Sequence, residues 1–228
     1  MLEGYGGLLA QGLWVTLKVA LLSLGAAFGI GLAGAVAKLS PWRPAAWTAT
    51  LYTTVIRGVP PLVLMLLVYY SVQIGLNRLT EAAGLRQIDI DPLTAAVATL
   101  GFIYGAYFTE TFRGAFLAVP RGQMDAAMAV GMGRCQAFRR ILFPQMMRLA
   151  LPGLTNNWLV LLKSAGLVSL LGLVDMVMVA RQAGNATNRQ FFFYLVTALV
   201  FLALTSASQL VLSRLERRYS LGVREAGP

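Results

Sequence analysis

The sequence predicts an all-α membrane protein whose chain crosses the bilayer several times. Of its 228 residues, 57% are hydrophobic and only 12% are charged. A soluble domain of this length needs more charged residues to cover its surface. Because each transmembrane helix takes roughly 20 apolar residues, the length allows about five spans with modest loops. We therefore expect a single transmembrane domain over residues 1–228 and no second, soluble domain.

Long apolar stretches mark the expected spans. They cover residues 13–37, 45–77, 93–113, 151–180 and 190–213. The second stretch contains the sequence RGVPP at 57–61, which predicts either a kink that fits the helix into the bundle or a hinge. Since the first dozen residues contain no basic segment, we expect the first span to be retained and not cleaved as a signal peptide.

The positions of lysine and arginine predict the orientation of the chain. Cytoplasmic loops carry most of the lysines and arginines of a membrane protein. This bias is satisfied with the N-terminus outside and the C-terminus in the cytoplasm, which places the segment 120–148 in the cytoplasm.

The net charge of +10 does not indicate nucleic-acid binding, because the basic residues are scattered among the loops. The lack of histidine and the single cysteine exclude a histidine-based triad, an intrachain disulfide and a zinc site.

Small residues in the first and third spans predict close helix packing. Gly25 and Gly29 have GxxxG spacing, as do Gly101 and Gly105. Small residues let helix backbones approach each other where lipid provides no hydrophobic drive for association. We expect both motifs to pack within the chain.

The segment DAAMAVGMGRCQAFRRILFPQ at 125–145 is short, basic and punctuated by glycine. Asp125 is placed to cap a first short helix, which Gly131 and Gly133 end. A second amphipathic helix follows, and we expect Pro144 to stop it. Helices this short need a surface to pack on. Their periodicity fits two surfaces equally, the inner leaflet of the membrane and a soluble partner protein.

The spacing in this segment resembles the cytoplasmic loop signature of ABC importer permeases. The family pattern is Glu-Ala-Ala, three residues, Gly, nine residues, Ile, one residue and Leu-Pro. The chain matches it, with Asp in place of Glu and Phe in place of Leu, at Asp125, Ala126, Ala127, Gly131, Ile141, Phe143 and Pro144. Neither replacement changes the chemistry much, so the resemblance favours docking on an ATPase over binding to lipid.

The resemblance extends over nearly the whole chain. Stretches such as YTTVIRGVPPLVLMLLVYY, NNWLVLLKSAGLVSLLGL and LERRYSLGV are similar to the Q-type permease subunits of bacterial histidine and basic amino acid importers. The resemblance implies a type I ABC importer permease fold in the bacterial inner membrane. It also implies transport of histidine, lysine, arginine and ornithine by alternating access.

The same resemblance implies the partners. The chain contains no GxxxxGK[ST] phosphate-binding loop, so we expect it to bind no cofactor and to be a transport subunit without an ATPase site. ATP and Mg would bind to two partner ATPase subunits. A second, related permease would complete a heterodimer, and a periplasmic binding protein would deliver the amino acid.

By this resemblance the short helix pair couples the ATPase to the spans. The small residues would let the two backbones approach, Phe138 would be the apolar anchor, and the arginines would pair with carboxylates of the ATPase. Pro144 and the helix after it would pass the motion to the spans. The residues expected to take part are Asp125, Ala126, Ala127, Gly131, Arg134, Phe138, Arg139, Ile141 and Pro144.

Ionisable residues at membrane depth are candidates for the substrate pathway, because they are expensive to place there. Glu110 and Asp175 could meet the cationic side chain of a basic amino acid. Asn157, Lys163 and Arg57 could meet its carboxylate or other polar groups. Each also has a structural alternative, above all Glu110.

For Glu110 the structural alternative is an ion pair. Both Arg57 and Arg113 are within reach as partners, the latter at (i, i+3) spacing.

Two other functions compete with an ABC permease. An ion-coupled secondary amino acid transporter would show inverted repeats, and the sequence has no convincing repeat. A membrane-embedded enzyme would need an aspartate or a serine–lysine site, and Lys163 and Ser164 are adjacent and point to different faces of a helix.

Overall fold

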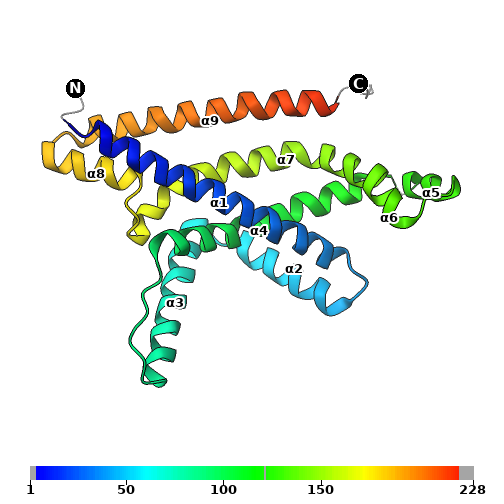
Figure 1. Ribbon diagram of the computed structural model, residues 1–228, viewed down its shortest axis with the longest axis horizontal. Coiled ribbons are helices and arrows are strands. Elements are labelled where there is room, and N and C mark those ends of the chain that lie inside the picture. The colour runs from blue at the N-terminus through cyan, green and yellow to red at the C-terminus, as the bar shows by residue number, and fades with distance from the viewer. Residues whose placement is uncertain (1–3, 121, 221–228) are drawn as a thin grey trace.

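The structure is a computed structural model that describes residues 4–120 and 122–220. Over these residues the chain is helical and has no strand. Four long helices run roughly along the long axis of the molecule: α1 (Gly6–Leu39), α4 (Pro92–Ala118), α7 (Phe143–Ser164) and α9 (Gln190–Ser220). A fifth, α3 (Pro61–Ala82), stands away from them at one side (Figure 1).

The prediction of five spans is confirmed. Within the described part of the chain, five helical segments are long and apolar enough to cross a membrane. Four of them are α1, α3, α4 and α9, and the fifth runs from Arg134 to Leu171 and includes α7. α1 begins at Gly6, earlier than expected, because the residues before 13 continue the same helix.

The second apolar stretch, predicted as one span over 45–77 with a break at RGVPP, is two helices that separate at this break, so the prediction of a single span is wrong. α2 (Arg43–Gly58) ends before Val59, which is extended, with φ −115° and ψ 141°. A residue that precedes proline is pushed out of the helical region, and Pro60 has no N–H to continue the hydrogen bonds. Pro61 then lies in the first turn of α3, where a proline is well tolerated. Of these two helices, α3 is the one that meets the criteria for a span.

The fourth stretch also differs from the predicted range of 151–180. α7 ends at Ser164 and continues as a 3-10 helix, η2 (Ala165–Leu171). Gly172 adopts a left-handed conformation with φ +87°, which ends η2. Asp175 then caps α8 (Met176–Thr187), a separate short helix that packs against α1 and α9. The span therefore extends toward residue 134 and not toward residue 180.

Pro144 does not stop the second short helix, contrary to the prediction. α6 (Arg134–Ala137) runs through a π-helical turn, η1 (Phe138–Leu142), directly into α7. Pro144 lies in the first turn of α7. The wider π turn lets the chain continue past a residue that has no N–H. The predicted coupling segment thus consists of α5 (Gly122–Ala129), a glycine turn and the N-terminal extension of a span.

α1 and α4 form the closest helix pair of the core. Gly101 and Gly105 of α4 lie against Ala26 and Ile30 of α1, where an added Cβ at either glycine would come within 2.6 Å of a side-chain atom. The prediction that this motif packs within the chain is confirmed. The motif Gly25–Gly29 has no neighbour within 4 Å of such a Cβ. On α1 the close approach to α4 is made instead by Gly31 and Gly34.

Candidate functional site

The coupling segment projects from one end of the bundle, where α4 ends and α7 begins (Figure 1). Asp125 lies in the first turn of α5, and Asp125 and Ala126 are exposed whereas Ala127 is buried. Arg134 and Arg139 are exposed on the second helix, as is Pro144 in α7, while Ile141 is half-buried. Most of the predicted docking residues are thus accessible to a partner at this end of the molecule.

A glycine turn joins the two helices of the segment, as predicted. Gly131 has φ +87°, a left-handed conformation in which a side chain is strained. The N–H of Met132 donates to the carbonyl of Ala127 at 3.1 Å, which closes the end of α5. Gly133 has φ −66° and ψ 153°, an ordinary extended conformation. The turn therefore requires glycine at 131 but not at 133.

Phe138 has a role in the structure beyond the predicted one. Its side chain is 39% exposed, so part of the ring is available to a partner. The ring centroid also lies 6.3 Å from that of Phe116 in α4 and 6.1 Å from that of Phe143 in α7. Phe138 thus packs the second short helix onto the end of α4. The sequence held no signal for this contact, because it joins residues on different helices.

Glu110 is the centre of an ion-pair cluster that joins three helices. Its Oε1 accepts a hydrogen bond from Lys38 Nζ of α1 at 2.5 Å, and its Oε2 accepts one from Arg113 Nε at 2.9 Å. Lys38 Nζ also donates to Thr53 Oγ1 of α2 at 2.8 Å. The predicted alternative of a pair with Arg113 is confirmed, whereas the pair with Arg57 is not formed. Lys38 was missed because the first span was expected to end at residue 37, one residue before it.

Arg57 lies beside this cluster without joining it. Its guanidinium is 5.6 Å from the centroid of the Tyr107 ring, a cation–π contact between α2 and α4. Arg57 is exposed, and it lines an open surface cavity of about 340 Å³ together with Glu110. The residues that line it are Lys38, Thr53, Thr54, Arg57, Gly58 and Glu110.

The other three candidates lie elsewhere. Asn157 is buried and donates from Nδ2 to Thr111 Oγ1 at 2.9 Å, which ties α7 to α4. Lys163 is exposed near the end of α7. Asp175 is fully buried, and its Oδ1 caps α8 by accepting from the N–H of Met178 at 2.9 Å. The five candidates for the substrate pathway therefore do not form one site, and Glu110 and Arg57 are the two that share a cavity.

Two tyrosines of α4 connect Arg57 to the end of α7. Tyr104 is buried, and its hydroxyl is 2.5 Å from Ser164 Oγ at the end of α7. The rings of Tyr104 and Tyr107 lie 5.6 Å apart. Ser164, Tyr104, Tyr107 and Arg57 thus form a row of polar side chains that leads to the cavity at Glu110.

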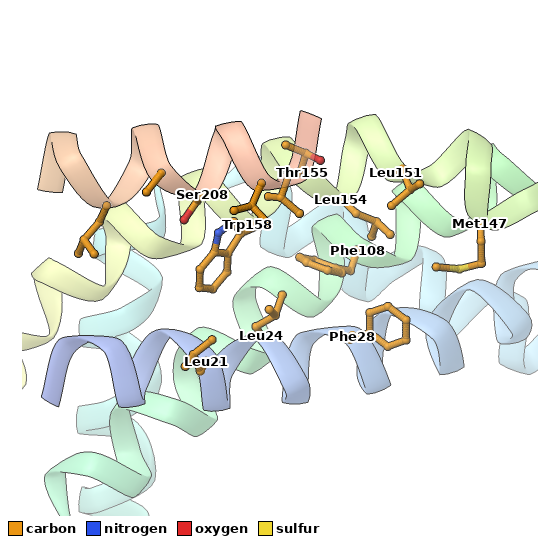
Figure 2. A pocket seen from close by; sticks show the side chains of 14 residues that line it. Leu21, Leu24, Phe28, Phe108, Met147, Leu151, Leu154, Thr155, Trp158 and Ser208 are labelled. Atoms are coloured by element: carbon orange, nitrogen blue, oxygen red, sulfur yellow. The ribbon is translucent and has the colours of Figure 1, made fainter. Parts of the chain in front are cut away.

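A larger groove of about 630 Å³ lies between α1, α4, α7 and α9. Figure 2 shows Leu21, Leu24 and Phe28 of α1 facing Phe108 and Trp158 across it. Apart from the hydroxyls of Thr155 and Ser208 and the indole N–H of Trp158, its labelled side chains are hydrocarbon or thioether. Such walls suit an acyl chain better than a charged amino acid, because an unpaired charge against them would be costly. The polar cavity at Glu110 and Arg57 is therefore the better candidate for a hydrophilic ligand.

The helical bundle with an exposed pair of short helices at one end has the features of a membrane permease. The chain belongs to the family described as binding-protein-dependent transport system inner membrane component, which matches residues 25–221. The predicted resemblance to ABC importer permeases is thus confirmed, and the chain is a multi-pass inner membrane protein. A permease of this class works with ATPase subunits, a binding protein and a second permease.

Among curated relatives, the chain is 57% identical to the histidine/lysine/arginine/ornithine transport system permease protein HisQ of Escherichia coli, over 99% of both chains. It is 38% identical to the nopaline permease NocQ of Agrobacterium fabrum, over 97% of this chain and 94% of the relative. The arginine ABC transporter permease ArtQ of Escherichia coli is 34% identical, over 92% of both chains. These relatives place the chain among the permeases of amino acid transport.

Solved structures support the same fold. A chain of a crystal structure described as an amino acid ABC transporter with histidines superposes with a TM-score of 0.79 and 33% identity, over 94% of this chain and 95% of that one. A chain of the methionine ABC transporter MetNI in an inward-facing conformation gives a TM-score of 0.74 at 21% identity, over 96% and 99%. The second likeness shows the fold alone.

Proposed function

We propose that the chain is the permease subunit of an importer that moves histidine, lysine, arginine and ornithine across the bacterial inner membrane. The proposal is supported by 57% identity over 99% of the chain to a relative whose name states those four substrates. Transport would proceed by alternating access driven by ATP hydrolysis on partner subunits, which would hold ATP and Mg. This chain would bind no cofactor and would act as one transmembrane domain.

The assembly would be a heterodimer of this chain with a second, related permease, joined by two ATPase subunits and a periplasmic binding protein. Much of the surface of α3 and α9 is exposed in this chain alone, including Leu67 and Tyr70 of α3 and Leu199 and Leu202 of α9. Such faces need either lipid or a second permease to cover them. The N-terminus would lie outside and the coupling segment in the cytoplasm.

The observation that carries the coupling role is the exposed pair α5–α6, which bears the family spacing at one end of the bundle. The second short helix continues into α7 without a break. A displacement of the docked segment would therefore move α7 directly, and the contacts of Phe138 with Phe116 and Phe143 would move the end of α4 with it. The coupling element acts as an extension of a span and not as a separate helix that Pro144 hinges.

Substitution of Gly131 tests this role. Gly131→Arg puts a bulky side chain into a left-handed turn at the docking surface, so we expect the variant to insert into the membrane but to lose most ATPase binding and uptake. The complex would be purified by a tag on this chain, the co-purifying ATPase quantified, and ATP-dependent uptake measured in proteoliposomes with the loaded binding protein.

The matched control is Gly84→Arg. Gly84 also has a positive φ, +66°, and open space around it, but it lies in the loop after α3. The Gly84→Arg variant should retain ATPase binding. Normal ATPase binding together with normal uptake in Gly131→Arg would contradict the docking role. Uptake that persists without ATP and ATPase, driven by an ion gradient, would instead support a secondary transporter.

A further inference from the structure

The apolar groove between α1, α4, α7 and α9 has the length of one lipid chain. Its wall on α7 runs from Met147 to Trp158, which Figure 2 shows toward opposite ends of the groove. An α-helix rises about 1.5 Å per residue, so this wall is about 17 Å long. Half of the hydrocarbon core of a bilayer is about 15 Å thick. The groove therefore matches the depth of a single leaflet.

The groove lies in the half of the bundle that bears the coupling segment. Met147 is in the second turn of α7, close to where the coupling segment joins that helix. The wall on α9 runs from Leu204 to Leu212, in the C-terminal half of that helix. Figure 1 shows that the start of α7 and the end of α9 point toward the same side of the molecule. In the proposed orientation that side is cytoplasmic, so the inner leaflet surrounds the groove.

Two arginines continue the walls of the groove toward the cytoplasm. Arg148 lies seven residues before Thr155 on α7, and Arg218 lies seven residues after Val211 on α9. Seven residues are about two helical turns, which puts each arginine on the same face of its helix as the groove residue. Arg148 is half-buried and Arg218 is exposed. Within the described part of the chain, neither forms an ion pair.

The charge at this end of the groove is positive overall. Glu216 is also there, and its Oε1 accepts a hydrogen bond from Thr155 Oγ1 at 2.6 Å, which ties α9 to α7. Arginine predominates over this carboxylate, since the last turns of α9 carry Arg214, Arg217 and Arg218. An arginine binds phosphate oxygens with two parallel hydrogen bonds. An apolar groove that ends in arginines is thus complementary to an acyl chain that ends in a phosphate.

The same charge disfavours a protein helix as the occupant. The cytoplasmic ends of membrane helices are generally rich in lysine and arginine, so a helix of a second permease would bring more positive charge to Arg148 and Arg218. An anionic headgroup brings the opposite charge. Lipids of the inner leaflet supply such headgroups at the required depth.

We propose that this groove binds one anionic phospholipid of the inner leaflet, with an acyl chain against α1, α7 and α9 and the phosphate on Arg148 and Arg218. The inference goes beyond the proposed function, because it concerns a ligand that is not transported. It also has a consequence for coupling. Since α7 continues directly from the coupling segment, the bound lipid would contact the span that the ATPase moves.

Trp158 is a probe inside the groove. The assembled complex, purified in detergent, would be titrated with phosphatidylglycerol whose acyl chains carry bromine, which quenches tryptophan fluorescence on contact. We expect saturable quenching, and we expect the saturable part to be lost in Trp158→Phe. Brominated phosphatidylcholine should give no saturable quenching at the same concentrations, because its headgroup has no net charge.

The headgroup contact is tested by Arg148→Gln/Arg218→Gln. A basic residue near the membrane surface contributes about 1 kcal/mol to the binding of an anionic lipid, so we expect the pair to weaken the binding of phosphatidylglycerol about thirtyfold. The matched control is Arg43→Gln/Arg86→Gln, which removes two exposed arginines away from the groove. It should leave the affinity unchanged.

The chain contact is tested by narrowing the groove while both arginines stay. Ala207 lines the groove, whereas Ala203, one turn earlier on α9, does not. Ala207→Phe should therefore weaken the binding of phosphatidylglycerol, and Ala203→Phe should not.

Three results would each overturn the proposal. The first is equal quenching by the two brominated lipids, and the second is an unchanged affinity in an Arg148→Gln/Arg218→Gln complex that still holds its ATPase. The third is the absence of saturable quenching in the assembled complex, since the second permease would then cover the groove. ATP-dependent uptake is measured separately, so a failure of the proposed function is distinguishable from a failure of the lipid site.

Discussion

At the scale of single residues, the charged side chains that were predicted at membrane depth differ in the partners that they have in the structure. Glu110 connects α1 and α4 through Lys38 and is only 16% exposed at its side chain. Asp175 is buried at the start of α8, where it accepts a backbone hydrogen bond. Arg57 has no such partner among the described residues. The role of an ionisable residue at membrane depth can therefore be assigned only when its structural partners are known.

The pair Lys38–Glu110 should contribute to stability. Glu110→Gln leaves Lys38 and Arg113 without their counter-charge, and we expect the free energy of unfolding to fall by about 1.5–3 kcal/mol. Removing Lys38 as well, in Lys38→Met/Glu110→Gln, should cost less than the sum of the two single changes. A double-mutant cycle from denaturant unfolding of the purified subunit measures the coupling. Strict additivity would show that the pair contributes nothing.

Asp175 should act as a helix cap and not as a substrate ligand. Its Oδ1 accepts from the N–H of Met178 at 2.9 Å. Asp175→Asn keeps an acceptor at this position, so we expect uptake of lysine to be retained. Asp175→Ala removes it and should destabilise the protein by about 1 kcal/mol, measured as a lower unfolding temperature in detergent. Loss of uptake in a stable Asp175→Asn variant would assign the carboxylate a direct role with the substrate.

At the scale of elements, small residues decide how closely α1 and α4 approach. Gly31 lies against the backbone and side chain of Phe108, and Gly34 lies against Thr109. Lipid offers no hydrophobic drive that pushes two apolar helices together, so close backbone contact supplies the attraction. The sequence predicted this correctly for α4 but chose the wrong glycines on α1, because several candidates occur within ten residues and only the crossing point selects among them.

Gly31→Leu tests the contact between α1 and α4. A Cβ at residue 31 would overlap Phe108, so the helices must separate, and we expect a loss of about 1–3 kcal/mol of stability. Gly29→Leu is the control on the same helix, because nothing lies within 4 Å of a Cβ at residue 29. Thermal unfolding of the two variants in the same detergent gives the comparison. Equal stability of both variants would contradict the packing shown here.

At the scale of the whole molecule, the predicted function requires the coupling segment and the loop 83–91 to lie on opposite sides of the membrane. The chain supplies its own probe for this, because Cys135 lies in the coupling segment and is exposed. The orientation with the N-terminus outside places Cys135 in the cytoplasm. The loop 83–91, which connects α3 to α4, would then lie outside.

A membrane-impermeant maleimide should therefore label Cys135 in inside-out vesicles and not in right-side-out vesicles. Labelling should also slow when the ATPase is bound. The control variant Cys135→Ser/Leu85→Cys moves the thiol to an exposed position in the loop after α3, and its labelling pattern should be the reverse. Labelling of Cys135 from outside would contradict both the orientation and the ATPase-docking role.

The sequence by itself determined the class of protein, the number of spans and the position of the coupling segment. These depend on local properties, namely the length of apolar stretches and the spacing of residues within some twenty positions. The tertiary structure alone decided that Lys38 is the partner of Glu110, 72 residues away in the chain, and that Arg57 faces a cavity beside them. The physical reason is that such contacts depend on where helices cross, and apolar composition does not specify the crossing points.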